Sequence, residues 1–163
     1  MTGALQDQVI DQTVRLVHVR AGSLSAIRSV KGKRIMAIVE TQIDSSASMT
    51  VHTVQGVITT KEILTVVDNY YKGTITKLIL WNFLESELTP ISAEDVRELA
   101  SLTKKYCKSR PGGKTALVFG RLADYGIGRM FQVLSEISDD NVEFMPFNDM
   151  SSAVEWLGVS HNK

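Results

Sequence analysis

The feature that most constrains the fold of this chain is a regular alternation of short apolar segments with longer amphipathic ones from residue 37 onward. Lys77–Phe83 (KLILWNF) has the length of a strand and is nearly continuously apolar, as in strands that are covered on both faces. The longer segments repeat their apolar residues every three or four positions, which is the period of a helix with one buried face. We therefore expect an α/β fold with a mixed, mostly parallel sheet and helices packed on it.

Turn and capping residues set the boundaries of the expected elements. Asp44–Ser48 has turn chemistry and predicts a hairpin between the two apolar segments beside it. Thr59 and Glu62 form a capping box that opens a helix, and Gly73 is expected to end that helix in the left-handed conformation. In chain order the expected elements are strands Ala37–Ile43 and Met49–Val57, a helix from Thr59, strand Lys77–Phe83, a helix from Ser92, strand Thr115–Phe119, a helix through Ile127–Leu134, strand Val142–Phe147 and helix Asp149–Leu157. The expected order is therefore ββαβαβαβα.

The composition is that of one ordinary globular domain. The chain has 163 residues, 44% of them hydrophobic, and its formal net charge of zero favours neither a nucleic-acid partner nor a membrane surface. It has no run of about 18 apolar residues and no secretory signal, so we expect no membrane insertion and a cytoplasmic location. The single Cys107 cannot form an internal disulfide, and the three histidines lack metal-ligand spacing. We expect no metal and no cofactor.

Basic residues gather near the end of the second expected helix. They are Lys104, Lys105, Lys108, Arg110 and Lys114. Positive charge suits the carbonyl end of a helix, which favours a solvated helix end. The alternative is a patch that binds phosphate or nucleic acid.

Two glycine-containing segments resemble phosphate-binding loops. Gly112–Thr115 reads GGKT, but the glycine required five residues before the second one is replaced by Lys108, and the segment enters a strand rather than a helix. Gly120–Gly128 does lie between a strand and a helix, but its glycines do not follow the G-x-G-x-x-G spacing. We expect Asp124 to cap that helix and its glycines, Gly126 and Gly128, to let it approach the sheet; anion binding by the helix start is the alternative.

The chain shows no set of residues that requires an enzyme. It lacks a G-x-S-x-G elbow and a Cys–His arrangement, so we expect no catalytic residues. Glu85 and Glu87 follow a strand, at the edge where α/β active sites lie, without an evident partner. A hydrolase or transferase would instead have a polar pocket with perturbed carboxylates near Glu85 or Asp124.

Several segments together resemble the STAS-like (SpoIIAA-like) superfamily of bacterial proteins. They are the PGGKTALV entry to a strand, the YGIGRMF helix start and the terminal F-x-D-x-x-x-A-x-x-W-L from Phe147 to Leu157. The resemblance covers about residues 37–158.

This resemblance implies a non-catalytic regulatory module with four helices that binds a protein partner. In the family's anti-sigma-factor antagonists, a phosphorylated serine opens a helix within an Asp-Ser-Ser/Thr-Gly motif. That motif is absent here, and Ser92 is the serine nearest to the equivalent place. We expect Ser92 to act first as a helix cap and second as a regulatory phosphosite. Paired tyrosines such as Tyr70 and Tyr71, if exposed, would suit the surface of a homodimer.

The related CRAL-TRIO lipid-carrier architecture gives a second hypothesis, in which an apolar pocket between sheet and helices holds a small lipophilic ligand. The candidate pocket residues are Tyr70, Tyr71, Trp81, Phe83, Tyr125, Met130, Phe131 and Trp156. The alternative is that they form the core or a protein interface.

Residues 1–35 lie outside the resemblance, and we divide the chain into this extension and a domain at 36–163. One interpretation is a flexible basic arm; another is that the natural start is Met36. Val14–Val19 could add a strand to the sheet.

Overall fold

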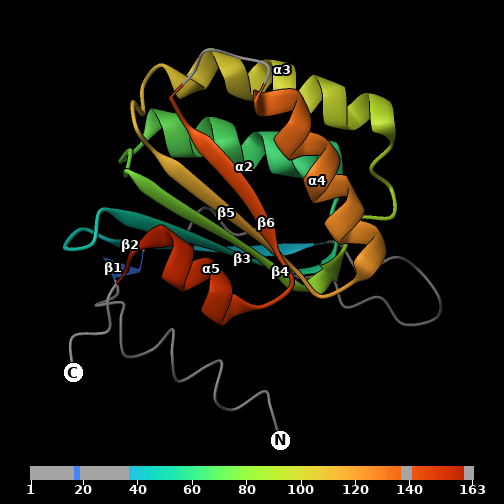
Figure 1. Ribbon diagram of the computed structural model, residues 1–163, viewed down its shortest axis with the longest axis horizontal. Coiled ribbons are helices and arrows are strands. Elements are labelled where there is room, and N and C mark those ends of the chain that lie inside the picture. The colour runs from blue at the N-terminus through green and yellow to red at the C-terminus, as the bar shows by residue number, and fades with distance from the viewer. Residues whose placement is uncertain (1–16, 19–36, 137–140, 160–163) are drawn as a thin grey trace, which may run out of the picture.

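The computed structural model describes residues 17–18, 37–136 and 141–159, and it confirms the α/β fold (Figure 1). The elements follow the expected order, with one further short strand before the hairpin. The strands are β1 (Val17–His18), β2 (Ile38–Asp44), β3 (Met49–Val57), β4 (Leu78–Glu87), β5 (Lys114–Phe119) and β6 (Glu143–Phe147). The helices are α2 (Thr60–Lys72), α3 (Ala93–Cys107), α4 (Leu122–Glu136) and α5 (Met150–Leu157).

The strands form one sheet in sequence order, from β1 to β6. β2 pairs antiparallel with both β1 and β3, whereas β3, β4, β5 and β6 are parallel to their neighbours. Asp44 ends the first arm of the predicted hairpin, and its Oδ1 accepts hydrogen bonds from the backbone N–H groups of Ser46 and Ala47. Of the predicted strand at Val14–Val19, Val17–His18 form β1; the other predictions for residues 1–35 lie outside the described residues.

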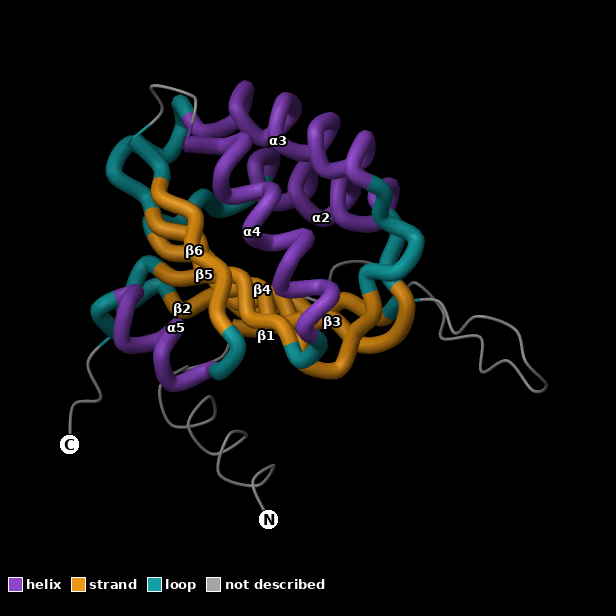
Figure 2. Tube along the Cα trace, turned by 45° about the vertical axis from the view of Figure 1, so that its right-hand side comes forward, coloured by secondary structure: helices purple, strands orange, loops and turns teal. Residues whose placement is uncertain are grey.

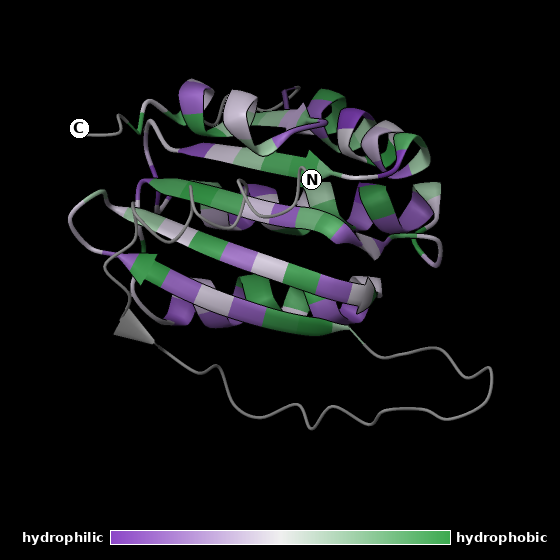
Figure 3. Cartoon of the chain, turned by 90° about the horizontal axis from the view of Figure 1, so that it is seen from below, coloured by the Kyte–Doolittle hydropathy of each residue, from purple (hydrophilic) through white to green (hydrophobic). Residues whose placement is uncertain are grey.

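The sequential order of the parallel strands explains the layers. Each crossover from β3 to β6 moves to the next strand in the same direction, and crossovers of one hand then place their helices on one face. Figure 2 shows α2, α3 and α4 together above the sheet and α5 alone below it. α5 contacts β4, β5 and β6, so it covers only part of its face, as the view from below shows (Figure 3).

Side-chain alternation divides the interior into two main cores. In β4, Trp81 and Phe83 face α2–α4, and their rings stack with centroids 5.5 Å apart. Leu80 points to the opposite face and packs with Met150 and Leu157 of α5. The nearly continuous apolar run of β4 therefore supplies both cores at once.

The capping signals at Thr59 and Ser92 work as the sequence predicts, whereas those at Gly73 and Asp124 do not. Thr59 and Glu62 form the expected capping box, with the Thr59 N–H 2.8 Å from a Glu62 carboxylate oxygen. Asp149 caps α5, and Gly158 ends that helix with φ of +76°. The prediction of a left-handed Gly73 is wrong: its φ is −103°, and its N–H bonds the carbonyl of Tyr70 without a reversal of φ.

The glycines at the start of α4 play different roles. A Cβ on Gly128 would overlap the ring of Phe119, so this glycine allows α4 to approach the sheet, as predicted. The same prediction for Gly126 is wrong, because a Cβ there would meet no atom within 4 Å. Gly120 also lies against backbone, since its Cβ would be 2.5 Å from the carbonyl oxygen of Leu84.

These contacts predict opposite effects for two matched substitutions in one helix. Gly128→Ala should lower the free energy of unfolding by about 1–3 kcal/mol, because the Phe119 ring must move within a packed core. Gly126→Ala should raise it by up to about 1 kcal/mol, because alanine favours a helix over glycine and space is open. Urea denaturation of both variants measures the difference; equal effects would contradict the close approach of α4.

Candidate ligand-binding site

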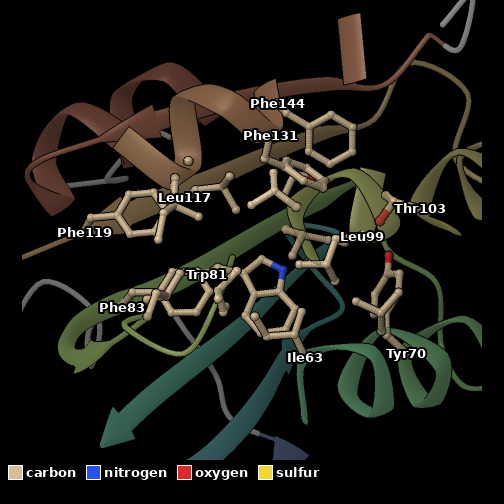
Figure 4. Close-up of a pocket in the computed structure, with 18 of the residues that line it drawn as sticks. Ile63, Tyr70, Trp81, Phe83, Leu99, Thr103, Leu117, Phe119, Phe131 and Phe144 are labelled. Atoms are coloured by element: carbon tan, nitrogen blue, oxygen red, sulfur yellow. The ribbon is translucent and has the colours of Figure 1, made fainter. Parts of the chain in front are cut away.

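An apolar cavity of about 90 Å³ lies between the sheet and helices α2, α3 and α4 (Figure 4). The sheet contributes side chains of β4 and β5 to its wall, and β6 contributes Phe144. The helices contribute Ile63 and Tyr70 from α2, Leu99 and Thr103 from α3, and Phe131 from α4. Side chains of α2, α3 and α4 therefore all line the same partly enclosed space.

The structure brings together most of the residues predicted for a pocket. Lining the cavity are Tyr70, Tyr71, Trp81, Phe83 and Phe131.

Three predicted pocket residues lie elsewhere. Tyr125 and Met130 pack against the same core without lining the cavity. Trp156 belongs to α5 on the opposite face, with its ring 5.7 Å from that of Phe147. Helical periodicity places Trp156 on a buried side of its helix but carries no information about which face of the sheet that helix covers.

Arg110 is the cavity residue that the sequence interpretation misplaced. Within the basic cluster it was expected on a solvated helix end, but it is only 3% exposed. Its guanidinium lines the cavity and lies 5.9 Å from the centroid of the Tyr70 ring. The lysines of the expected cluster do not form one patch with it: Lys104, Lys105 and Lys108 are exposed, while Lys114 lies over the ring of Trp156 at 4.9 Å.

The guanidinium of Arg110 is held by neutral acceptors. Nε donates to the carbonyl of Thr76 at 3.1 Å, and Nη2 donates to the carbonyls of Lys77 and Lys114 at 3.0 Å each. Nη1 donates to the hydroxyl of Thr115 at 3.1 Å. Among the described residues no carboxylate forms an ion pair with Arg110, so neutral carbonyl and hydroxyl dipoles stabilise its positive charge.

The Tyr70 hydroxyl completes this end of the cavity. It donates to the carbonyl of Thr76 at 2.7 Å and accepts from the N–H of the same residue at 2.8 Å. The next residue, Tyr71, has a raised pKa because burial disfavours its phenolate, while the nearby Arg110 acts in the opposite direction. The polar groups here are thus mostly engaged in holding backbone.

His52 lies behind the cavity wall and is uncharged near neutral pH. Its ring is 4.4 Å from that of Trp81, and its Nδ1 is 2.9 Å from the Thr41 hydroxyl oxygen. Complete burial, together with the smaller effect of the positive charge of Arg110, lowers its pKa to about 3. The sequence interpretation gave His52 no role.

Trp81 carries a polar group that the described residues leave without a partner. Its side chain is 6% exposed, and no acceptor in the described part of the chain bonds its Nε1–H. Figure 4 shows the indole nitrogen directed into the space framed by Leu99 and Phe131. Buried indole N–H groups usually find an acceptor, so this donor marks the polar point of an apolar cavity.

A separate group of charged residues lies near the carboxyl ends of the parallel strands. Asp124 is the third residue of α4 rather than its cap, and burial raises its pKa while Arg121 acts in the opposite direction. Its Oδ2 is buried without a hydrogen bond, 4.0 Å from Nε of Arg121. Arg121 also pairs with Glu87 at 3.2 Å, and Glu85 accepts a hydrogen bond from Gln55 at 2.8 Å.

This charged group meets the expectation for an enzyme only in part. It contains one perturbed carboxylate, Asp124, but the cavity described above is apolar and does not include it. Within residues 17–18, 37–136 and 141–159, no three His, Cys, Asp or Glu side chains are placed to share a metal ion.

Ser92 occupies the cap position that the sequence predicts. Its Oγ accepts from the N–H of Asp95 at 3.2 Å and donates to the carboxylate of Asp95 at 2.7 Å. A phosphate on Ser92 would therefore meet Asp95 and the nearby Glu94. The proposed phosphorylation stays a prediction.

The GGKT segment lies as expected between a helix and a strand. Lys114 is the first residue of β5, and its Nζ bonds the carbonyl of Trp156 at 3.2 Å. The side chain is therefore engaged on the α5 face of the sheet.

No protein-family model and no curated protein matches this chain. The STAS-like resemblance therefore rests on the sequence motifs alone. Of the helices in the described ranges, none combines the length and apolar character needed to cross a bilayer.

The buried His52 predicts a specific pH dependence of stability. Its pKa is about 3 when folded and 6.5 when unfolded, so between these values the unfolded chain binds one more proton. The free energy of unfolding should fall as the pH drops below 6.5, by up to about 1.4 kcal/mol per pH unit from this group. Denaturation between pH 7.5 and 5, above the range of ordinary carboxylates, measures that slope.

His52→Gln is the matched variant for this measurement, because it removes the titration and leaves Asp124 in place. The raised pKa of Asp124 acts with the opposite sign and cancels in the comparison. The slope should flatten in the variant, whatever its absolute stability. Parallel curves for the two proteins would contradict a neutral, buried His52.

Proposed function

We propose that this protein is a non-catalytic binding domain that holds a small lipophilic molecule in the cavity between its sheet and helices α2, α3 and α4. The observation that carries this proposal is a partly enclosed apolar space whose wall is built from all three helices and the sheet. Ligand sites typically combine such walls with a few placed polar groups, here Trp81, Thr103 and Arg110.

The cost of an empty cavity supports an occupant. Apolar voids destabilise a fold by roughly 24 cal/mol per Å³, which for a cavity of about 90 Å³ is about 2 kcal/mol. A ligand that fills the space recovers the lost contacts of residues such as Leu99 and Leu117. An engineered apolar cavity of about 150 Å³ binds benzene, which has six heavy atoms, so the molecule expected in this smaller cavity has no more heavy atoms than benzene.

The proposal predicts a ligand that is lost when the cavity is filled. Native mass spectrometry after gentle purification should show an added small mass on the wild type, and Leu99→Phe should abolish it because the new ring occupies the space. Leu102→Phe is the matched control, since Leu102 lies on the same helix outside the cavity. Identical spectra for all three proteins, without an added mass, would count against the proposal.

The second candidate is the protein-binding regulatory module that the STAS-like resemblance implies. It is favoured by aliphatic side chains on the outer side of α4, where Leu122 is 83% exposed and Val133 51% exposed. The open position at Gly126 lies between them on the helix. A protein captured by the wild type and lost with Leu122→Asp and Val133→Asp, without an effect of Leu99→Phe, would favour this function.

The proposal extends to the location of the protein in the cell and to its oligomeric state. We place the protein in the bacterial cytoplasm, because a lone buried Cys107 suits a reducing compartment and the motifs resemble a bacterial superfamily. A homodimer through the exposed side of α4 would be consistent with the second candidate.

A further inference from the structure

We propose that the occupant of the cavity is a short-chain carboxylate, bound with its oxygen on the indole N–H of Trp81 and its alkyl chain along the apolar wall. This inference rests on the proposed ligand-binding function and adds the chemical class of the ligand. It is carried by the Nε1–H of Trp81, a residue that is 6% exposed and whose indole no described residue accepts from, and by the positive charge of Arg110 in the cavity wall.

The first step is the missing acceptor. The cavity wall is apolar around Trp81, with Ile79, Leu99 and Leu117 among the lining residues. None of them has a side chain that accepts a hydrogen bond. A ligand that brings an oxygen to this point gives the indole N–H an acceptor that the cavity wall does not offer. A pure hydrocarbon does not.

The second step is the sign of the charge. Arg110 is the charged residue in the cavity wall, and no aspartate or glutamate lines it. Its guanidinium lies 5.9 Å from the Tyr70 ring, which lies 6.1 Å from His52, whose ring is 4.4 Å from that of Trp81. These four side chains therefore form one cluster with a single net positive charge, since His52 is neutral. An anion gains from that charge and a cation is repelled.

The third step is the capacity of Arg110 to act on a ligand. Four of its five N–H groups bond Thr76, Lys77, Lys114 and Thr115, which keeps the guanidinium in place. All four acceptors are neutral, so a fixed positive charge faces the cavity from a preorganised position. Its contribution is long-range attraction of the carboxylate, whereas the direct hydrogen bond belongs to Trp81.

The size of the cavity selects the probes. Butyrate, butyramide and n-butylammonium share a short alkyl chain and differ in charge, while propane has the chain without a polar group. The inference predicts that butyrate binds at least tenfold more tightly than butyramide, and that n-butylammonium binds more weakly than either. Propane tests the apolar cavity alone.

Nuclear magnetic resonance of the ¹⁵N-labelled full chain gives a direct readout, because the chain has two tryptophans and so two indole N–H signals. Trp156→Phe assigns the signal of Trp81. Butyrate should move the Trp81 indole proton downfield, as a new hydrogen bond requires, and leave the Trp156 signal on the other face unchanged. Trp81→Phe should weaken butyrate binding at least tenfold and leave propane binding intact.

The outcomes separate the two proposals. Propane binding without a butyrate-induced shift of Trp81, or equal affinities for butyrate and butyramide, would overturn the carboxylate inference and leave the proposed function standing. Failure of every probe to perturb the methyl signals of Leu99 and Leu117 would overturn both. If Trp81→Phe does not fold, the ranking of probes on the wild type still decides the matter.

Discussion

The order of the parallel strands is the constraint on which the rest of this structure depends. Because β3, β4, β5 and β6 follow one another across the sheet, successive crossovers place α2, α3 and α4 on the same face and leave α5 to cover the other. The three-helix layer must bury far more side-chain volume than the α5 side. It does so with aromatic rings, of which Trp81, Phe83 and Phe119 stack along the sheet.

That aromatic layer also explains why a cavity remains. Stacked rings are rigid and broad, and the helices above them contribute branched side chains that cannot fill every gap between flat surfaces. Gly128 brings α4 close at one end, where it meets Phe119. At the other end the buried guanidinium of Arg110 holds the carbonyls that precede β4 and lead into β5, so this part of the wall cannot collapse inward.

The sequence predicts those features whose causes are local. The predicted caps at Thr59 and Ser92 depend on a side chain and a backbone N–H within three residues, and both are found. The alternation of strands and helices likewise follows from the period of the apolar residues. Five of the eight predicted pocket residues line the cavity because they lie on the apolar stripes that face the helix layer.

The features that the sequence does not predict depend on tertiary placement. Arg110 belongs to a run of basic residues and carries no local sign of burial; its position follows from where the chain turns into β5. The periodicity of α5 does not indicate which face of the sheet this helix covers. Trp156 therefore lies on the α5 face and not, as the sequence predicts, in the cavity beneath α2, α3 and α4. Of Gly126 and Gly128, only Gly128 lies against the ring of Phe119, and the sequence does not distinguish the two positions. Asp124 lies inside α4 because that helix begins at Leu122, two residues before it.

The central claim is that the space beneath α2, α3 and α4 is a binding site for a small lipophilic molecule. A crystal of the full chain under xenon pressure tests it most directly, because xenon binds apolar cavities and is located by its own scattering. The account predicts a xenon atom between Trp81, Leu99 and Phe131. A crystal without xenon there, in which side chains close the space or bound water fills it, would contradict the claim.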